Sequence, residues 1–445
     1  MQRIVVIGAD ATGMSAAHQA LRRAKSRGQD VDIVVLEQTQ HTSYSACGIP
    51  YWIAGDVDSG ADLVARTAQE HRDAGLDLRL GAKVTAVDLA ARTVTVGGER
   101  LSYDDLVFTT GAHPIVPDWA RVDQVEGVAP VKTLDDGAAW LDRLSGMGRR
   151  VVIAGGGYIG VEMAETALRR GHVVSLITRS RVMSALDPDM GELVAQRLRD
   201  AGVEVLENAE VRGLVDVDGR VSTVDTTRGS HDADLVVLAM GVRPNTELLA
   251  GQVDLADSGA LRPDGHGRVT EHLWAAGDNS EVRHRVTGEW AYLPLGTHAN
   301  KHGRALGDSV AGGDLTFDGA LGTAITRFAY EGAYAEISCT GLSEAQSADL
   351  DTVAVVTEGT TASGYLPDAE PITIKMRAER GSRRLLGVQI VGGHGAGKRI
   401  DTAAAVLWHR ETVDDLAWMD LSYAPPFATA WEILQIAARR VAERL

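Results

Sequence analysis

Cys47 is the residue of this chain best suited to redox chemistry. It stands in segment 43–51, with the sequence SYSACGIPY, and the only other cysteine, Cys339, lies far downstream. Because no second thiol is near it in sequence, a local CxxC-type disulfide is excluded. A single thiol can instead cycle between the thiolate and a mixed disulfide with a small thiol, or between the thiolate and sulfenic acid. A buried structural cysteine is the alternative, and the nucleotide-binding motifs described next disfavour it.

The N-terminus predicts a dinucleotide-binding βαβ unit that would frame this thiol. Gly8 allows a tight turn and Gly13 lets the helix and strand pack closely, although Asp10 replaces the middle glycine. The following strand, 31–36, ends at Glu37, whose carboxylate is placed to accept hydrogen bonds from a ribose diol. The predicted first strand, glycine loop and helix are residues 3–7, 8–13 and 14–23.

A second unit of the same kind, in the middle of the chain, keeps all the glycines of the motif. Gly155, Gly157 and Gly160 follow strand 151–154 and open a helix that contains Glu162. The loop amides and the helix N-terminus together predict an anion site for a pyrophosphate.

The cofactor expected at the second site is NADPH, with NADH possible. Strand 173–177 runs into Arg179 and Arg181, and no carboxylate stands where a ribose 2′-hydroxyl would be recognised. Guanidinium groups suit a 2′-phosphate. Ordinary surface charges are the alternative interpretation of these arginines.

Two small-residue turns predict a return of the chain to the first nucleotide site. Thr110 and Gly111 follow the strand that begins at residue 106, and Gly277 and Asp278 end a segment of similar design. Close backbone approach at Gly277 would bring a ligand near Asp278, whose carboxylate suits a ribityl hydroxyl. Between two dinucleotide-binding units, this pattern indicates a flavin.

With these motifs the chain resembles the FAD-dependent pyridine nucleotide–disulfide oxidoreductase family over essentially its whole length. Within that family it is similar to the single-cysteine branch of coenzyme A disulfide reductases, NADH oxidases and NADH peroxidases. The resemblance implies FAD at the first site, NAD(P)H at the second and a homodimer. It rests on both glycine loops, segment 43–51 and the motifs at 110–112, 241–245 and 276–278.

The resemblance is closest to coenzyme A disulfide reductases. The oxidases and peroxidases carry a histidine in the first glycine loop, where this chain has Ala11, and the reductases use C-terminal tyrosines, which Tyr423 and Tyr365 match. The implied activity is NADPH-dependent reduction of coenzyme A disulfide or a related low-molecular-weight disulfide. The alternatives are an NAD(P)H oxidase or peroxidase that uses a Cys47 sulfenate, and a flavoprotein redox sensor without turnover.

The resemblance also implies roles for residues around the thiol. Tyr423 of the partner subunit, supported by Tyr365, would orient or protonate the leaving thiolate. Ser43, expected one helical turn before Cys47, can hydrogen-bond near the thiol. Two residues of the first helix resemble the polar residues of the family's coenzyme A pocket: Gln19 and Arg22.

Length and composition fit a multidomain α/β protein, with 445 residues of which 49 are glycine. The predicted fold has two Rossmann-like dinucleotide-binding domains plus a C-terminal α+β dimerisation domain. The latter is expected to contain strands at 353–356, 372–376 and 385–391 and a helix at 400–408. The expected domain boundaries are 1–112 and 241–318 for the FAD domain, 113–240 for the NAD(P)H domain and 319–445 for the dimerisation domain.

Charge and hydropathy limit the partners. A formal net charge of −17 disfavours nucleic-acid binding. No apolar stretch reaches the ~18 residues that a membrane span needs, and two distant cysteines favour a reducing compartment. We therefore expect a cytoplasmic protein that binds no membrane and no metal.

Overall fold

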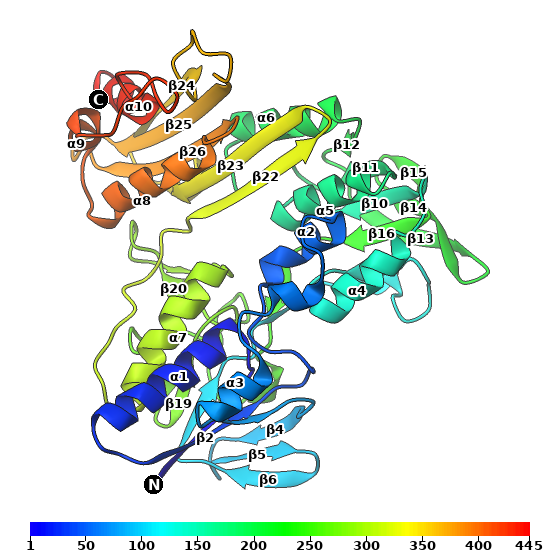
Figure 1. Cartoon of the computed structure of the whole chain (residues 1–445), viewed down its shortest axis with the longest axis vertical. Coiled ribbons are helices and arrows are strands. Elements are labelled where there is room, and N and C mark those ends of the chain that lie inside the picture. The colour runs from blue at the N-terminus through cyan, green and yellow to red at the C-terminus, as the bar shows by residue number, and fades with distance from the viewer.

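Three large sheets divide the chain into three regions, and the computed structural model describes all residues, 1–445. The first nucleotide-binding region lies at the bottom of Figure 1, the second at the right, and the C-terminal region at the upper left. No helix combines the length and the apolar character needed to cross a membrane.

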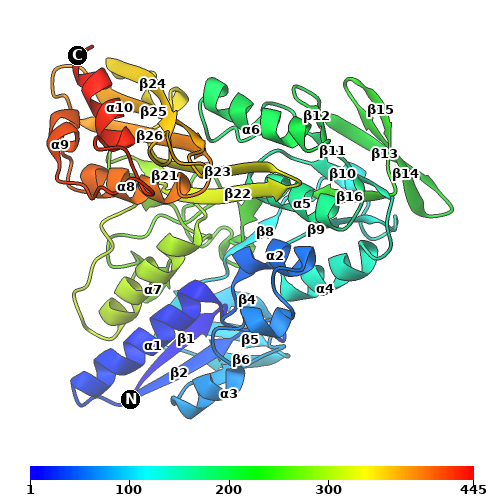
Figure 2. The same ribbon diagram turned by 45° about the horizontal axis from the view of Figure 1, so that its top comes forward.

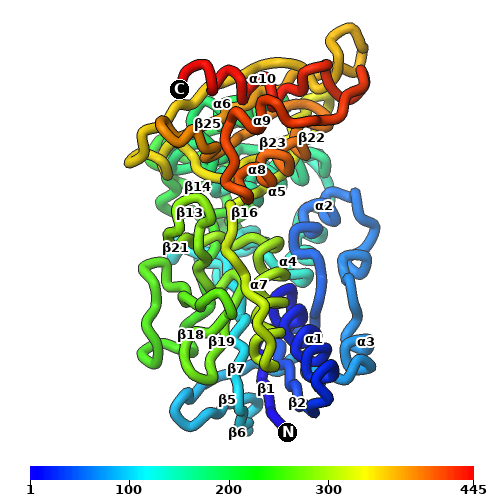
Figure 3. The backbone as a smooth tube through the Cα atoms, turned by 90° about the vertical axis from the view of Figure 1, so that its left-hand side faces the viewer, coloured from blue at the N-terminus to red at the C-terminus, as the bar shows by residue number.

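The first region is built on a six-stranded sheet of order β18-β19-β7-β1-β2-β3. Strand β19 pairs in parallel with β7, so the chain returns to this sheet late in the sequence, as the two small-residue turns predict. Helices α1 (Ala11–Ser26) and α7 (Gly296–Val310) lie side by side on it (Figures 1 and 3). Its strands are β1 (Gln2–Ile7), β2 (Val31–Leu36), β3 (Asp77–Arg79), β7 (Asp105–Phe108), β18 (Arg268–Thr270) and β19 (Leu273–Ala275).

Smaller elements complete this region. Cys47 lies in a short 3-10 helix (Ala46–Gly48) that leads into α2 (Ile49–Ala54). Helix α3 (Ala68–Asp73) precedes β3, and a three-stranded antiparallel sheet is formed by β4 (Val84–Asp88), β5 (Thr93–Val96) and β6 (Glu99–Ser102).

The second region is built on a parallel five-stranded sheet of order β12-β11-β10-β16-β9. An antiparallel pair, β8 (Ala112–Pro114) with β17 (Val242–Pro244), joins the points where the chain enters and leaves it. The sheet strands are β9 (Val128–Pro130), β10 (Arg150–Ala154), β11 (Val173–Ile177), β12 (Glu204–Leu206) and β16 (Leu235–Leu238), and the helices are α4 (Leu134–Arg143), α5 (Tyr158–Arg169) and α6 (Pro188–Asp200). A hairpin sheet is added by β13 (Val211–Val217), β14 (Arg220–Thr226) and β15 (Gly229–Asp232).

The C-terminal region is an antiparallel five-stranded sheet of order β22-β23-β26-β25-β24 with three helices. The hairpin of β22 and β23 extends toward α5 (Figure 2), and Phe328 and Ile337 of this hairpin share a core with the second region. The strands are β22 (Ala324–Tyr330), β23 (Ala333–Gly341), β24 (Thr352–Thr360), β25 (Pro371–Glu379) and β26 (Leu385–Gly392), and the helices are α8 (Ile400–Trp408), α9 (Val413–Trp418) and α10 (Ile433–Ala442). The predicted elements of this region are therefore present, with longer strands.

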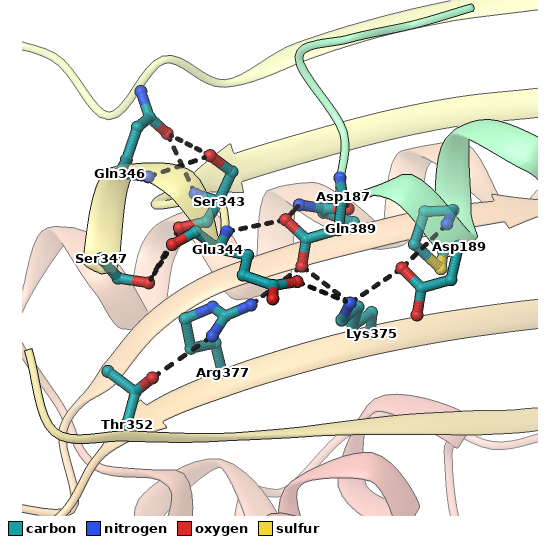
Figure 4. A network of polar contacts seen from close by, with 11 residues as sticks. Asp187, Asp189, Ser343, Glu344, Gln346, Ser347, Thr352, Lys375, Arg377 and Gln389 are labelled. Atoms are coloured by element: carbon teal, nitrogen blue, oxygen red, sulfur yellow. Dashed lines mark hydrogen bonds and ion pairs between the residues drawn. The ribbon is translucent and has the colours of Figure 1, made fainter. Parts of the chain in front are cut away.

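A buried carboxylate fastens the second region to the C-terminal sheet (Figure 4). Asp187, directly before α6, lies 2.9 Å from Lys375 Nζ and 2.9 Å from Arg377. Gln389 donates to the same carboxylate at 3.0 Å, and the backbone N–H of Glu344 donates at 2.7 Å. Because every donor comes from the C-terminal region, this contact fixes the docking of one region on the other.

Candidate active site

The first glycine loop is closed by backbone contacts that leave no room for side chains. Gly8 has φ of +100°, and a Cβ there would lie 2.3 Å from the carbonyl oxygen of Thr109. A Cβ at Gly13 would lie 1.9 Å from the carbonyl oxygen of Gly8. The start of α1 therefore packs directly on the loop, which is the geometry that a dinucleotide-binding turn requires.

Two carboxyl groups lie beside this loop. Glu37 accepts hydrogen bonds from the backbone N–H groups of Ala9, at 2.9 Å, and Thr39, at 2.8 Å, so its carboxylate fixes the loop. Asp10 keeps a buried Oδ1 without a hydrogen-bond partner. Burial raises its pKa to about 6, and the charge of Glu37 adds to the effect. The protonated carboxyl, which dominates below about pH 6, can donate to a phosphate oxygen.

The segment around Gly277, which follows β19, packs against the start of α1 next to the first glycine loop. Gly277 has φ of +86°, and a Cβ there would lie 2.3 Å from Thr12 Oγ1. Thr110 donates to the carbonyl oxygen of Asn245 at 2.6 Å, and Gly111 also has a positive φ, of +65°. The carboxylate of Asp278 lies 3.6 Å from Lys132 Nζ.

Lys132 was not predicted as a site residue. It follows β9, in a connection without a recognisable motif.

The second glycine loop has the same close backbone contacts as the first, except that the position of its middle glycine, Gly157, is open. A Cβ at Gly155, where φ is +123°, would lie 2.1 Å from the carbonyl oxygen of Ala239. A Cβ at Gly160 would lie 2.1 Å from the carbonyl oxygen of Gly155. Gly157, the N-cap of α5, has nothing within 4 Å of its Cβ position. This open position at a helix N-terminus leaves space for a phosphate.

Arg179 and Arg181 lie on the loop that borders this site. The loop is anchored where the backbone N–H of Met183 donates to the carbonyl oxygen of Gly156 at 2.7 Å. Both arginine side chains are exposed, and no carboxylate of the chain pairs with either one. They are therefore free to bind an external anion next to the second nucleotide site.

The thiol of Cys47 lies where the two nucleotide-binding regions meet. Helix α2, which begins two residues later, is fixed on α5 because Thr166 donates to the carbonyl oxygen of Pro50 at 3.1 Å. Cys47 is exposed and forms no disulfide. Partial desolvation of the thiol raises its pKa, the carboxylate of Glu162 raises it further, and Lys132 acts in the opposite direction.

Glu162 projects from α5 toward this thiol. Its Oε1 accepts a hydrogen bond from the hydroxyl of Thr326 at 2.8 Å. Burial raises the pKa of Glu162 to about 7, and the neighbouring Glu165 adds to the shift. The charge beside Cys47 therefore changes near neutral pH.

Ser43 differs from the sequence-based expectation. Residues 43–45 are not helical, and Ser43 has a positive φ of +48°, so it does not stand one helical turn before Cys47. Its hydroxyl lies 2.9 Å from Nε2 of His71, and Nδ1 of His71 lies 2.7 Å from Nε2 of His18. No sequence motif marks this histidine pair, because α1 and α3 meet only in the fold.

Gln19 and Arg22, three residues apart on α1, lie in different surroundings. Gln19 is buried, donates to Asp308 at 3.0 Å and accepts from Arg22 at 2.8 Å, so it points inward and orients the arginine. Arg22 itself lines a polar groove between α1 and α7. The other residues of this groove, none of them predicted, are Ser15, Asn300, Lys301 and Arg304.

Tyr365 and Tyr423 lie on two adjoining loops of the C-terminal region. Their side chains are 74% and 51% exposed, and neither hydroxyl bonds to the Cys47 segment of its own chain. The loops are held together because the backbone N–H of Ser363 donates to the carbonyl oxygen of Pro425 at 2.9 Å. Arg399 donates to the carbonyl oxygens of Thr361, at 2.8 Å, and Phe427, at 2.5 Å.

The two nucleotide sites, the lone thiol and the antiparallel C-terminal domain together define a family. Residues 2–301 match the family model described as pyridine nucleotide-disulphide oxidoreductase, and residues 333–434 match the dimerisation domain of that family. The chain belongs to the pyridine nucleotide-disulphide oxidoreductase family. It is an NAD(P)H-dependent flavoprotein oxidoreductase with FAD as its flavin, as the sequence predicts.

Similar proteins include reductases and oxidases. The NAD(P)H coenzyme A polysulfide/persulfide reductase of Pyrococcus horikoshii is 35% identical over 98% of this chain and 98% of its own length. An NADH oxidase of Enterococcus faecalis is 28% identical over 100% of both chains.

Solved structures give the same two kinds of relative. The NAD-dependent persulfide reductase of A. fulgidus has a TM-score of 0.93 and 31% identity, covering 99% of this chain and 83% of that chain. An engineered water-forming NADPH oxidase, bound to NADPH, has a TM-score of 0.93 and 28% identity, covering 99% of this chain and 98% of that chain. The choice between reductase and oxidase therefore depends on the site residues.

Proposed function

We propose that this protein reduces a small-molecule disulfide, coenzyme A disulfide or a related low-molecular-weight disulfide, with NADPH and through Cys47. The observation that carries the proposal is the basic groove between α1 and α7, where Arg22, Lys301 and Arg304 converge. A thiol that bears a nucleotide carries phosphate groups, and the cationic side chains of this polar groove can bind them. Relatives with coenzyme A-dependent activity support the same substrate class.

The reaction follows from the chemistry of a single thiol. The Cys47 thiolate attacks one sulfur of the disulfide, so a Cys47–thiol mixed disulfide forms and one thiolate leaves. Bound FAD supplies the transfer of two electrons from NADPH to this mixed disulfide. Cleavage releases the second thiolate and restores Cys47, and with one added proton the sum is one disulfide and one NADPH converted to two thiols and NADP⁺.

Tyr423 of the partner subunit is the proposed proton donor for the leaving thiolate, with Tyr365 in support. A neutral phenol suits this role because the leaving thiol has a pKa near ~8–9. The exposure of both tyrosines in one chain is what a cross-subunit role requires. Trp418 and Phe427, each 74% exposed in the same region, support a homodimer in which the partner covers them.

NADPH is the proposed electron donor, since Arg179 and Arg181 are exposed next to the second glycine loop. A comparison among the solved relatives supports this. A water-forming NADH oxidase was bound to NADH, and its engineered form, which loses one aspartate and gains two arginines among five substitutions, was bound to NADPH.

An NAD(P)H oxidase that uses a Cys47 sulfenate is the competing assignment, because NADH oxidases align over the whole chain. Ala11 disfavours it, since no imidazole in the glycine loop is present to assist a sulfenate.

The experiment compares Cys47→Ser and Tyr423→Phe in two assays, thiol release from coenzyme A disulfide without oxygen and oxygen consumption without disulfide. We expect Cys47→Ser to abolish thiol release and Tyr423→Phe to slow it by ~10²-fold, the scale for loss of an acid catalyst. Tyr103→Phe is the matched control, because the Tyr103 hydroxyl is buried without a partner. Thiol release at the parent rate in Tyr423→Phe would refute the proposal.

Mixed dimers of the two variants test the cross-subunit arrangement. If Tyr423 serves the partner's thiol, one of the two sites in a Cys47→Ser and Tyr423→Phe heterodimer is intact, and about half of the parent activity returns. If it serves its own chain, no intact site forms and the heterodimer stays inactive.

A further inference from the structure

A third exposed arginine, Arg228, lies beside the loop that carries Arg179 and Arg181. It stands in the turn between β14 and β15. Its Nη1 donates to the carbonyl oxygen of Glu207 at 2.9 Å. This is the only hydrogen bond of its side chain, and no carboxylate pairs with it. Since a guanidinium has five N–H donors, most of those of Arg228 are left for a partner outside the chain.

Segment 206–210, which follows β12, connects the β14–β15 turn to the loop of the other two arginines. On one side, the backbone N–H of Asn208 donates to the carbonyl oxygen of Ser180, which stands between those two arginines, at 2.8 Å. On the other side, the backbone N–H of Thr227 donates to the carbonyl oxygen of Glu210 at 2.9 Å. The three arginines are therefore carried by two separate turns that are hydrogen-bonded to one segment.

One carboxylate of this segment, that of Glu207, holds the end of the arginine loop. Its Oε1 accepts a hydrogen bond from the backbone N–H of Val182 at 2.8 Å, and its Oε2 lies 3.4 Å from Arg199 on α6. Arg199 also pairs with Glu192 at 2.7 Å. The side chain of Glu207 is only 16% exposed, so its bond to the loop is largely shielded from water. The cation of Arg199 offsets a charge that would otherwise oppose a phosphate at this loop.

We propose that Arg228 is a third cation for the 2′-phosphate of NADPH, and that Glu207 is a positioning residue that holds the loop of Arg179 and Arg181 in place. A phosphate monoester carries about two negative charges at neutral pH and presents three acceptor oxygens, so guanidinium groups from two turns can bind it together. The 2′-hydroxyl of NADH carries no charge for them to bind. The proposal deepens the NADPH preference of the proposed function and rests on it.

The first test measures the binding of NADP⁺ and NAD⁺, which differ only in the 2′-phosphate, by isothermal titration calorimetry on the oxidised, FAD-loaded enzyme. Arg228→Met should raise the Kd for NADP⁺ roughly five- to twentyfold, the range for an exposed charge-assisted contact, and should change the Kd for NAD⁺ by less than about twofold. Arg228→Lys keeps the charge and should lose less affinity than Arg228→Met. The parent's ratio of the two Kd values in Arg228→Met would overturn the proposal.

Arg220→Met is the matched control for this measurement. Arg220 is an exposed arginine at the other end of β14, where it lies 3.1 Å from Glu126. The variant removes the same charge from the same small sheet, far from segment 206–210, so NADP⁺ should bind as in the parent. An equal loss in Arg220→Met and Arg228→Met would reveal a general effect of net charge and would contradict the direct contact.

Two variants of Glu207 separate its hydrogen bond from its charge. Glu207→Ala should loosen the arginine loop and raise the Kd for NADP⁺ several-fold, with the Kd for NAD⁺ nearly unchanged. Glu207→Gln should bind NADP⁺ at least as tightly as the parent, because its amide oxygen still accepts from Val182 and a negative charge near the phosphate is gone. Equal losses for both nucleotides in Glu207→Ala, or weaker NADP⁺ binding in Glu207→Gln, would overturn the positioning role.

The same titrations separate this proposal from the NADPH preference on which it rests. If the parent binds NADP⁺ no more tightly than NAD⁺, the preference and the proposal fail together. If the parent prefers NADP⁺, loses that preference when Arg179 and Arg181 are both replaced by alanine, and keeps it in Arg228→Met, only the third cation fails. We expect the preference to fall in both of these variants.

Discussion

Around Cys47, two charged side chains act on the thiol in opposite directions. The carboxylate of Glu162 raises the thiol pKa, and Lys132 lowers it. Since the pKa of Glu162 is itself raised to about 7, its influence grows as the pH rises through neutrality. The reactivity of the thiol is therefore set by a balance that changes with pH.

We expect Glu162→Gln to lower the pKa of Cys47 and Lys132→Met to raise it. Each unit of pKa changes the thiolate fraction about tenfold below the pKa, so alkylation should become several-fold faster in the first variant and slower in the second. The rate of iodoacetamide labelling of Cys47, followed from pH 6 to 9, measures both. Shifts in the same direction in the two variants would contradict this electrostatic account.

The exposed arginines give a second residue-scale prediction. Replacing Arg179 and Arg181 together by alanine should remove most of the preference for NADPH, since a charge-assisted phosphate contact contributes on the order of 1.5–3 kcal/mol. The KM for NADPH should rise, and the KM for NADH should change little. Equal KM values for both cofactors in the unmodified enzyme would disprove the preference.

At the scale of elements, one arginine bonds to both loops that carry Tyr365 and Tyr423, in addition to the hydrogen bond from Ser363 to Pro425. Arg399 donates to the carbonyl oxygens of both loops and pairs with Glu432 at 2.5 Å. Arg399→Met should loosen both loops and slow thiol release about tenfold or more, as expected when a proton donor is misplaced. Flavin reduction by NADPH, measured by stopped-flow absorbance, should keep its rate, and a matching loss there would point to general misfolding.

Much of the secondary structure could be predicted from the sequence. Strands 31–36 and 173–177 match β2 and β11, because buried parallel strands are continuous apolar runs. The glycine loops could also be predicted from the sequence, since tight turns and close packing require glycine.

Lys132 and His71 could not be predicted as site residues. Each comes from a segment without a motif and reaches the site only through long-range packing. Ser43 shows the same limit, because the spacing to Cys47 suggested a helical turn and the backbone adopts a left-handed conformation instead.

At the scale of the whole molecule, the buried Asp187 cluster links two regions that must hold a fixed relation (Figure 4). Asp187→Asn should destabilise the protein by about 3–5 kcal/mol, because the buried cation of Arg377 would lose its only carboxylate partner, whereas Lys375 would keep Asp189 and Glu344. Asp189→Asn is the control, since Asp189 is 49% exposed and also contacts Lys375, and it should cost about 1 kcal/mol or less. Thermal unfolding measures both, and equal losses would show that the cluster does not fasten the two regions.

The central claim is that Cys47 carries the substrate thiol as a mixed disulfide, and intact mass under non-reducing conditions tests it most directly. The protein with Cys47 reduced by a small thiol, its flavin oxidised and the excess thiol removed, should gain one coenzyme A per chain when it is mixed with one equivalent of coenzyme A disulfide without oxygen. Peptide mapping should place it on Cys47, with Cys339 unmodified, and added NADPH should remove it. No adduct on Cys47, together with its conversion to sulfenic acid when oxygen is admitted, would contradict the reductase account and support the oxidase.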